Sequence, residues 1–293
     1  MKFAAIDIGS NAVRFQISRP LQEDNPNSSF KRVEYTRLPL RLGEDVFTQG
    51  KISPKKVKLL TKAMQAFSFL MEIYNVDGYL ACATSAMRDA SNSKAVIKEI
   101  AEKTGIKIQV ISGMSESEII RNAVLDDLPS KNGYVHIDVG GGSTEISFIK
   151  NGELLASESF NVGTVRMFQG KDLEKQHARM KKWVKENASS KTTWKALGSG
   201  GNINKLFRLI QKEKAGWISR NQMKYKLKVI GKMTHKERIY EMGFNPDRAE
   251  VIDHAGAIYT NVMRWAKSEK MYVSGKGLKE GIIKDLWRKH IAK

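Results

Sequence analysis

Cysteine is nearly absent from this chain of 293 residues, and long apolar runs are absent. Because Cys82 is the only cysteine, no disulfide can form within the chain, and a reducing compartment is expected. Its apolar surroundings at residues 78–84 favour a packing role over a reactive thiol. No run reaches the roughly 18 apolar residues of a membrane helix, and the first apolar run, broken by Asp7, lacks a signal-peptide pattern. We therefore expect a cytoplasmic protein that does not enter a membrane.

Acidic residues are also scarce, since 50 Lys and Arg stand against 31 Asp and Glu. The net charge of +19 favours a polyanionic partner, although a generally basic solvated surface would look the same. Aromatic residues make up only 8%, and they do not alternate with basic residues as they do where bases stack. The composition therefore disfavours nucleic acid as the polyanion.

Three consecutive glycines lie within residues 134–149. Apolar residues alternate with polar ones up to Val139, three glycines follow, and the alternation resumes after Thr144. This pattern predicts a strand, a turn and a second strand. Glycines let backbone N–H groups approach an anion closely, and Asp138 and Glu145 place a carboxylate at each edge of the turn. The stretch is typical of a phosphate cradle with metal ligands, or of a tight hairpin whose glycines serve only the turn.

A second copy of this plan lies near the N-terminus, in residues 3–17. Asp7 and Asp138 stand 131 positions apart, a period that indicates duplicated domains rather than a solenoid of short repeats. Neither copy has the Gly-Lys-Ser/Thr of a Walker loop or the G-x-G-x-x-G of a dinucleotide fingerprint. Two such hairpins facing each other would direct two aspartates and two phosphate-binding turns at one ligand.

Helix signals fill the intervals between these hairpins. Ser53 and Pro54 suit the N-cap and first position of a helix. The run from Ser115 to Glu118 matches an S-x-x-E capping box, so Glu118 is expected to cap while Glu116 has only the first-turn preference for acids. Residues 129–133 are the best candidate linker, and residues 198–201 form a third glycine turn that opens a helix, where backbone donors can bind an anion.

Taken together, the motifs resemble one family. They are Ile6 to Asn11, Ala83 to Arg88, Ile111 to Gly113 with Glu116, Asp138 to Glu145, Gly198 to Gly201, and Gly277 to Gly281. In this order and spacing the chain resembles the exopolyphosphatase and guanosine pentaphosphate phosphatase family, within the superfamily of actin, sugar kinases and Hsp70.

The resemblance implies an α/β fold of two ribonuclease-H-like domains flanking a cleft, residues 1–128 and 129–293, with the terminal helix packing back on the first domain. It implies that Glu116 activates or orients the attacking water, and that Asp138 and Glu145 hold Mg²⁺ with Asp7 facing them. The groups implied to surround phosphate oxygens are Ser10, Asn11, Arg88, Gly140, Gly141, Gly142, Ser143, Gly198, Ser199, Gly200 and Gly201.

Three features depart from the family pattern. Ser115 stands where the family often has a second acidic residue beside Glu116, and Lys279 stands where it usually has Arg, which removes a planar bidentate donor. The chain also stops just after the terminal helix, without the additional helical domain that helps longer members hold extended polyphosphate.

The resemblance implies Mg²⁺-dependent release of terminal phosphate from polyphosphate. The alternatives are hydrolysis of guanosine pentaphosphate or a related nucleotide, and a sensor that binds polyphosphate or nucleotide without catalysis. The fold alone would also allow an actin-like or sugar-kinase ATPase, although Glu116 in the family position argues against a kinase. Homodimers are common in the family, so a homodimer is considered as well.

Overall fold

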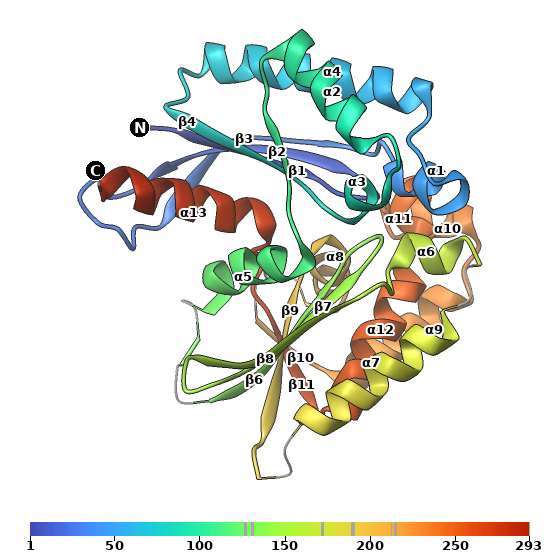
Figure 1. Cartoon of the computed structure of the whole chain (residues 1–293). Helices are drawn as coiled ribbons and strands as arrows, with labels where there is room; N and C mark the ends of the chain where they lie inside the picture. Colours follow the sequence, from blue (N-terminus) through green and yellow to red (C-terminus); the bar gives the residue numbers. More distant parts are fainter. Residues whose placement is uncertain are drawn as a thin grey trace. The chain divides into compact units, whose positions relative to one another are not determined.

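In a computed structural model the chain is described at residues 1–125, 128–129, 132–170, 173–188, 191–211, 213 and 216–292. It divides into two units (Figure 1). Unit 1 comprises Met1–Ile119 and Leu278–Lys293, and unit 2 comprises Ile120–Gly277. The division therefore falls before the predicted boundary at residues 128/129, and the C-terminal segment is grouped with unit 1. The predicted linker at residues 129–133 lies partly outside the described residues.

Unit 1 is built on a five-stranded mixed sheet of order β3-β2-β1-β4-β5. Its strands are β1 (Phe3–Ile8), β2 (Val13–Pro20), β3 (Phe30–Leu38), β4 (Gly78–Ala83) and β5 (Ile108–Val110). Its helices are α1 (Leu42–Gln49), α2 (Pro54–Ile73), α3 (Ser85–Asp89), α4 (Ser93–Thr104) and α13 (Leu278–Ile291), and α5 (Gly113–Val124) spans the division between the units. The predicted hairpin of residues 3–17 is present as β1 and β2, paired antiparallel.

The two faces of this sheet are covered by different helices (Figure 1). Phe15 on β2 stacks on Phe67 of α2, with ring centroids 4.6 Å apart. On the opposite face Phe3 of β1 meets Trp287 of α13 edge to face. Ser53 caps α2 as predicted, because its side chain accepts from the N–H of Lys56 and Pro54 takes the first helical position.

Unit 2 contains a six-stranded mixed sheet of order β10-β11-β9-β6-β7-β8. Its strands are β6 (Gly133–Val139), β7 (Thr144–Lys150), β8 (Glu153–Phe160), β9 (Trp194–Ser199), β10 (Gly216–Ser219) and β11 (Lys270–Val273). Its helices are α6 (Thr164–Phe168), α7 (Glu174–Asn187), α8 (Gly201–Ile210), α9 (Arg220–Gly231), α10 (His235–Tyr240), α11 (Pro246–Ala249) and α12 (Ile252–Trp265). The predicted second hairpin is β6 and β7.

The two sheets share one topology, which bears out the predicted duplication. Read as β8-β7-β6-β9-β11, five strands of unit 2 repeat the order β3-β2-β1-β4-β5 of unit 1, and β10 is an added edge strand. In both units the first strand pairs antiparallel with the second and parallel with the fourth. Asp7 and Asp138 therefore occupy equivalent places, each near the end of its central strand.

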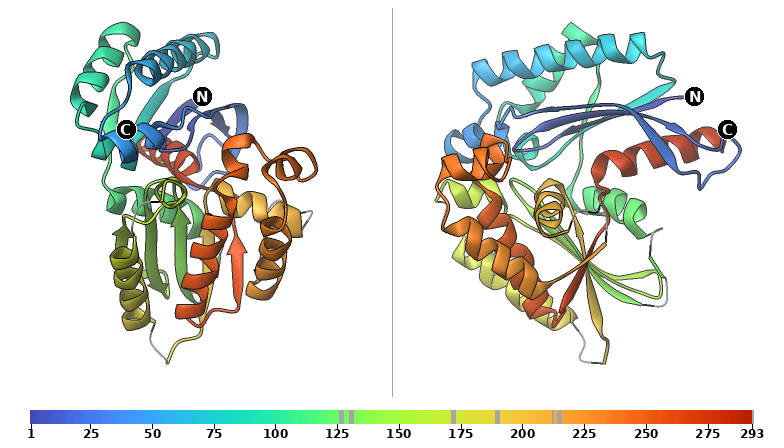
Figure 2. Two further views of the ribbon diagram at one scale, coloured as in Figure 1. Left: turned by 90° about the vertical axis from the view of Figure 1, so that its right-hand side faces the viewer. Right: turned by 180° about the vertical axis from the view of Figure 1, so that it is seen from behind.

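Apolar side chains gather on one face of the unit 2 sheet. Val135, Ile137 and Val139 of β6 belong to a buried cluster with residues of α7 and α12, which lie along this face (Figure 2). Because strand residues alternate between faces, His136 and Asp138 point to the other side. In the described part of the chain, the helices are too short or too polar to cross a bilayer.

Candidate active site

Unit 2 places the two predicted carboxylates side by side. Asp138 on β6 is directly opposite Glu145 on β7 in the antiparallel register, and a carboxylate oxygen of each lies within 4.8 Å of one of the other. Both are buried, with exposures of 7% and 1%. Like charges placed opposite one another across two strands destabilise the pairing, and buried charges require a partner. This arrangement fits a bound divalent cation, because hard cations such as Mg²⁺ prefer oxygen ligands.

A serine on each flanking strand orients one of the two carboxylates. Ser199 Oγ on β9 donates to Asp138 Oδ1 at 2.7 Å, and Ser159 Oγ on β8 donates to Glu145 Oε1 at 2.8 Å. The strand registers put these four residues in one row across β8, β7, β6 and β9. The acid pair is therefore held from both sides by hydroxyl donors.

The glycine turn between β6 and β7 is shaped by α6. Backbone N–H groups of Thr164 and Val165 donate to the carbonyls of Gly140 and Gly141, and Arg166 Nε donates to the carbonyl of Gly142 at 2.6 Å. In a planar trans peptide the C=O of one residue is antiparallel to the N–H of the next. The N–H groups of residues 141–143 therefore point away from the contacts that the carbonyls make with α6.

Gly163 allows this close approach of α6 to the turn. A Cβ at this position would lie 2.4 Å from the carbonyl carbon of Gly142, a contact that only displacement of the backbone could relieve. The sequence analysis assigned Gly163 and Arg166 no part in the site. The available signal was a glycine directly before a helix that follows the hairpin.

The third glycine turn borders the Asp138 carboxylate. Gly200 has a φ of +99°, and a Cβ on it would lie 2.9 Å from Asp138 Oδ1 and 3.5 Å from the Tyr259 hydroxyl. Ser199 is completely buried and its hydroxyl donates to Asp138. Gly198 packs under Met271, and Gly201 begins α8. The side chain of Ser199, which was predicted to bind phosphate, thus hydrogen bonds a carboxylate.

In unit 1, Asp7 has a different electrostatic environment from Asp138. Arg14 stands opposite Asp7 in the β1–β2 register, where Glu145 stands opposite Asp138, and Arg14 Nη1 lies 2.7 Å from Asp7 Oδ2. The arginine compensates the Asp7 carboxylate, whereas Asp138 has a second carboxylate opposite it. Sequence reasoning missed Arg14, although the same spacing of seven residues in both hairpins could have indicated it.

The remaining predicted groups of unit 1 gather around two short helices. Ser10 Oγ hydrogen bonds Ser85 Oγ at 2.8 Å, and the carbonyl of Asn11 accepts from the N–H of Arg41. Arg88 on α3 donates through Nη1 to the carbonyl of Ile111 at 2.8 Å. The Arg88 guanidinium is thereby tied to the chain segment that leads into α5.

Glu116 lies in the first turn of α5 and is almost fully buried. One of its oxygens, Oε2, is 3.7 Å from Arg88 Nη1, so the two predicted site residues are neighbours within unit 1. The predicted capping box is wrong, because α5 begins at Gly113 and Ser112 Oγ accepts from the N–H of Ser115. Ser115 and Glu118 are consequently inside the helix.

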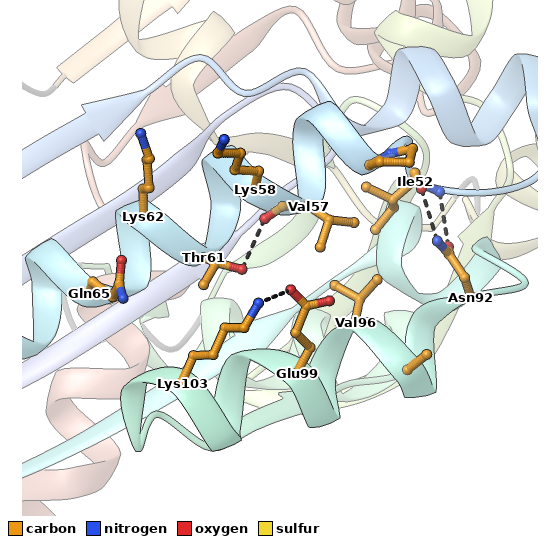
Figure 3. A pocket seen from close by; sticks show the side chains of 12 residues that line it. Ile52, Val57, Lys58, Thr61, Lys62, Gln65, Asn92, Val96, Glu99 and Lys103 are labelled. Atoms are coloured by element: carbon orange, nitrogen blue, oxygen red, sulfur yellow. Dashed lines mark hydrogen bonds and ion pairs between the residues drawn. The ribbon is translucent and has the colours of Figure 1, made fainter.

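Two surface hollows lie away from these residues. One of about 570 Å³ lies between α2 and α4, where Lys103 pairs with Glu99 and Asn92 makes two hydrogen bonds to the backbone of Ile52 (Figure 3). Another lies beside α7 and the end of α12 in unit 2. Neither is lined by a predicted site residue, and the contacts at the first are those of packed surface helices.

The chain matches known proteins in sequence and in fold. The family model of the Ppx/GppA phosphatase family matches residues 22–290. Exopolyphosphatase 1 of Mycobacterium tuberculosis is 25% identical over 304 residues, which cover 97% of this chain and 87% of that protein. A bifunctional 3-dehydroquinate synthase/phosphatase of Fusobacterium nucleatum is 32% identical over 207 residues, 66% of this chain, and the match spans 31% of that protein.

Solved structures show the same fold. An exopolyphosphatase from Cytophaga hutchinsonii superposes with a TM-score of 0.84 at 21% identity, covering 99% of this chain and 98% of that one. The Ppx/GppA family member of Aquifex aeolicus gives 0.79 at 23% identity, with coverages of 99% and 98%. The predicted fold class and the predicted exopolyphosphatase-like hydrolase are confirmed. Since the matching family model covers nearly the whole chain, this protein belongs to the Ppx/GppA phosphatase family.

Proposed function

We propose that this protein hydrolyses the terminal phosphoanhydride bond of inorganic polyphosphate with the help of Mg²⁺. The observation that carries the proposal is the buried acid pair of Asp138 and Glu145 beside the backbone N–H groups of residues 141–143, whose neighbouring carbonyls are held by α6. One feature attracts a cation and the other an anion, which is the pair of sites that a metal-bound phosphate needs. Membership of a phosphatase family supports the same assignment.

The catalytic contribution of each group follows from its chemistry. The backbone N–H groups of residues 141–143 and the Ser143 hydroxyl are the donors proposed for the oxygens of the terminal phosphoryl group. Asp138 and Glu145 would hold Mg²⁺, which would supply positive charge to neutralise the transferring group. Arg88 adds a fixed positive charge, because its guanidinium is held by the carbonyl of Ile111. Ser10 and Asn11 are further candidates for holding phosphate oxygens.

Glu116 is proposed to orient the attacking water and to accept its proton. Its carboxylate is supported by a position in the first turn of a helix and by Arg88 at 3.7 Å. Asp7 has a supporting role in this proposal, since Arg14 already compensates its charge.

Phosphate release tests the proposal directly. Long-chain polyphosphate, triphosphate, ATP and guanosine pentaphosphate would be compared with Mg²⁺ and with chelator. We expect release from polyphosphate that is abolished by chelation and by Glu116→Gln. Release from guanosine pentaphosphate alone would replace the substrate in the proposal. Tight binding of polyphosphate without release from any substrate would indicate a sensor.

A further inference from the structure

A continuous chain of buried hydrogen bonds lies behind the Asp138 carboxylate in unit 2. His136 Nε2 is 2.9 Å from Ser199 Oγ, and Ser199 Oγ is 2.7 Å from Asp138 Oδ1. His136 and Ser199 are completely buried, so neither reaches solvent. Both lie on the polar face of the sheet, because Ser199 is the register partner of Asp138 and His136 is two positions before it on β6.

The donors in this chain can be assigned by counting protons. An ionised carboxylate only accepts hydrogen bonds, so the single hydroxyl proton of Ser199 is directed at Asp138. Ser199 must then accept from His136, which requires the proton on Nε2 of a neutral imidazole. Each link is thereby given one direction, from His136 through Ser199 to Asp138.

The other ring nitrogen of His136 indicates that this chain is not there for stability. Within the described residues, Nδ1 is buried and has no hydrogen-bond partner. A buried polar atom without a partner lowers stability relative to an apolar side chain of similar size. The imidazole is therefore retained at a cost in stability, as expected for a residue kept for function.

Unit 1 shows that the fold does not require this chain. At the positions equivalent to His136 and Ser199, the duplicated sheet carries Ala5 and Cys82, since Cys82 is the register partner of Asp7. A thiol is only a weak donor and alanine has none. The chain of hydrogen bonds from His136 through Ser199 is thus confined to unit 2, where the aspartate faces another carboxylate.

Tyr259 fixes the backbone at the same place. Its hydroxyl accepts from the N–H of Val139 at 3.2 Å and donates to the carbonyl of Ser199 at 2.5 Å. The tyrosine therefore joins β6 and β9 next to the residues that carry the carboxylate and the hydroxyl. It holds the backbone while Ser199 holds the side chain.

We propose that His136, Ser199 and Tyr259 are positioning residues that orient the Asp138 carboxylate for a divalent cation. The inference rests on the metal-binding part of the proposed function. The three side chains act through Asp138, and none of them takes part in the reaction itself. Removing an outer partner of a metal ligand typically lowers metal affinity about 10–100-fold.

The decisive measurement is the affinity of the full chain for Mn²⁺ alone, from the electron paramagnetic resonance of the free ion. Ser199→Ala and His136→Leu should each weaken Mn²⁺ binding by about 10–100-fold. His136→Gln keeps an N–H donor near the position of Nε2 and should restore most of the affinity. Tyr259→Phe should weaken binding less than Ser199→Ala, because it changes the backbone brace only. The matched control is Ser157→Ala, whose hydroxyl hydrogen bonds Ser147 on the same face and should leave the affinity unchanged.

Thermal unfolding of the same variants in chelator separates positioning from a structural role. His136→Leu should have a Tm equal to or above that of the wild type while binding Mn²⁺ more weakly. A lower Tm with unchanged Mn²⁺ affinity in His136→Leu and Ser199→Ala would overturn the inference, as would a wild-type chain that binds no Mn²⁺. A wild type that binds Mn²⁺ but releases no phosphate from any substrate would overturn the proposed function alone, and the binding series would still decide the inference.

Discussion

One residue determines which charge faces the aspartate in each hairpin. Seven positions after the aspartate, unit 1 carries Arg14 and unit 2 carries Glu145, and each stands opposite its aspartate in the register. The backbone geometry is the same, but one carboxylate has a guanidinium at 2.7 Å and the other has a second carboxylate beside it. The acid pair therefore fits a bound cation better than Asp7 does.

Replacing Glu145 tests whether the acid pair binds a cation. Glu145→Gln removes the like-charge repulsion and can still accept from Ser159, so the Tm in chelator should be unchanged or higher. The rise in Tm that Mg²⁺ gives the wild type should be lost. Phosphate release should fall by more than about 100-fold, since changes to residues behind the ligands already cost 10–100-fold. Thermal unfolding with and without Mg²⁺ checks these expectations. The exposed Glu153→Gln is the control, and a full Mg²⁺-dependent rise in Glu145→Gln would contradict the metal assignment.

The packing role predicted for Cys82 can be tested through its reactivity. Burial raises the pKa of the Cys82 thiol to about 12, and the charges of Asp7, Glu116 and Asp285 add to the effect. Because the thiolate is the reactive form, the folded protein should not react with an aromatic disulfide reagent at pH 8. One thiol per chain should react in denaturant. Rapid labelling of the folded protein would show that the thiol is accessible.

At the scale of secondary-structure elements, the sequence predicts a helix end correctly where neighbouring residues alone fix that end. Ser53 and Pro54 place the start of α2, where Ser53 accepts from the N–H of Lys56. The S-x-x-E pattern at Ser115 was misleading, because Ser112 offers its hydroxyl three residues earlier and α5 begins at Gly113. Ser112 and Ser115 both carry a hydroxyl that could cap the helix, and in the structure the hydroxyl of Ser112 does so.

The contact between α6 and the glycine turn gives a prediction at this scale. Gly163→Ala would force the backbone of residues 141–142 to move, since the added Cβ has no space. We expect phosphate release to fall at least about 10-fold, because small misplacement of a positioning group is costly in catalysis. Gly231→Ala is the matched control. Its Cβ meets nothing within 4 Å and it lies at the end of α9, so the change should be neutral or stabilise by up to about 1 kcal/mol. Equal rates in both variants would show that α6 does not support the site.

At the scale of the whole molecule, the excess of 19 positive charges should act on encounter with a polyanion. The kcat/KM for long polyphosphate should fall as NaCl is raised from about 0.05 to 0.5 M, because the Debye length shortens from about 14 to 4 Å. Triphosphate carries fewer charges and should show a shallower dependence. Steady-state phosphate release at constant free Mg²⁺ measures both slopes. A kcat/KM that is independent of salt for both substrates would exclude electrostatic steering.

The sequence alone determined the features that rest on local pattern. Alternation of apolar residues up to Asp138 and beyond the glycines is enough to predict a hairpin, since side chains on a strand have a period of two. Repetition of that hairpin around Asp7 was enough to predict two domains of one topology. The same motifs were enough to identify the family. The role proposed for Glu116 comes from that resemblance, because local helix rules did not favour it.

Tertiary structure decided which partner each of these side chains has. Ser199 was predicted to bind phosphate, but strand pairing across 61 residues places its hydroxyl on Asp138. His136 looked like one polar residue in an alternating strand until β9 brought Ser199 against it. Arg14 and Glu145 are both seven residues from an aspartate, and only pairing shows that one neutralises its neighbour and the other repels it. Hydrogen bonds and charges act over a few ångströms. The partner of each polar side chain therefore depends on which residues, distant in the sequence, the fold brings next to it.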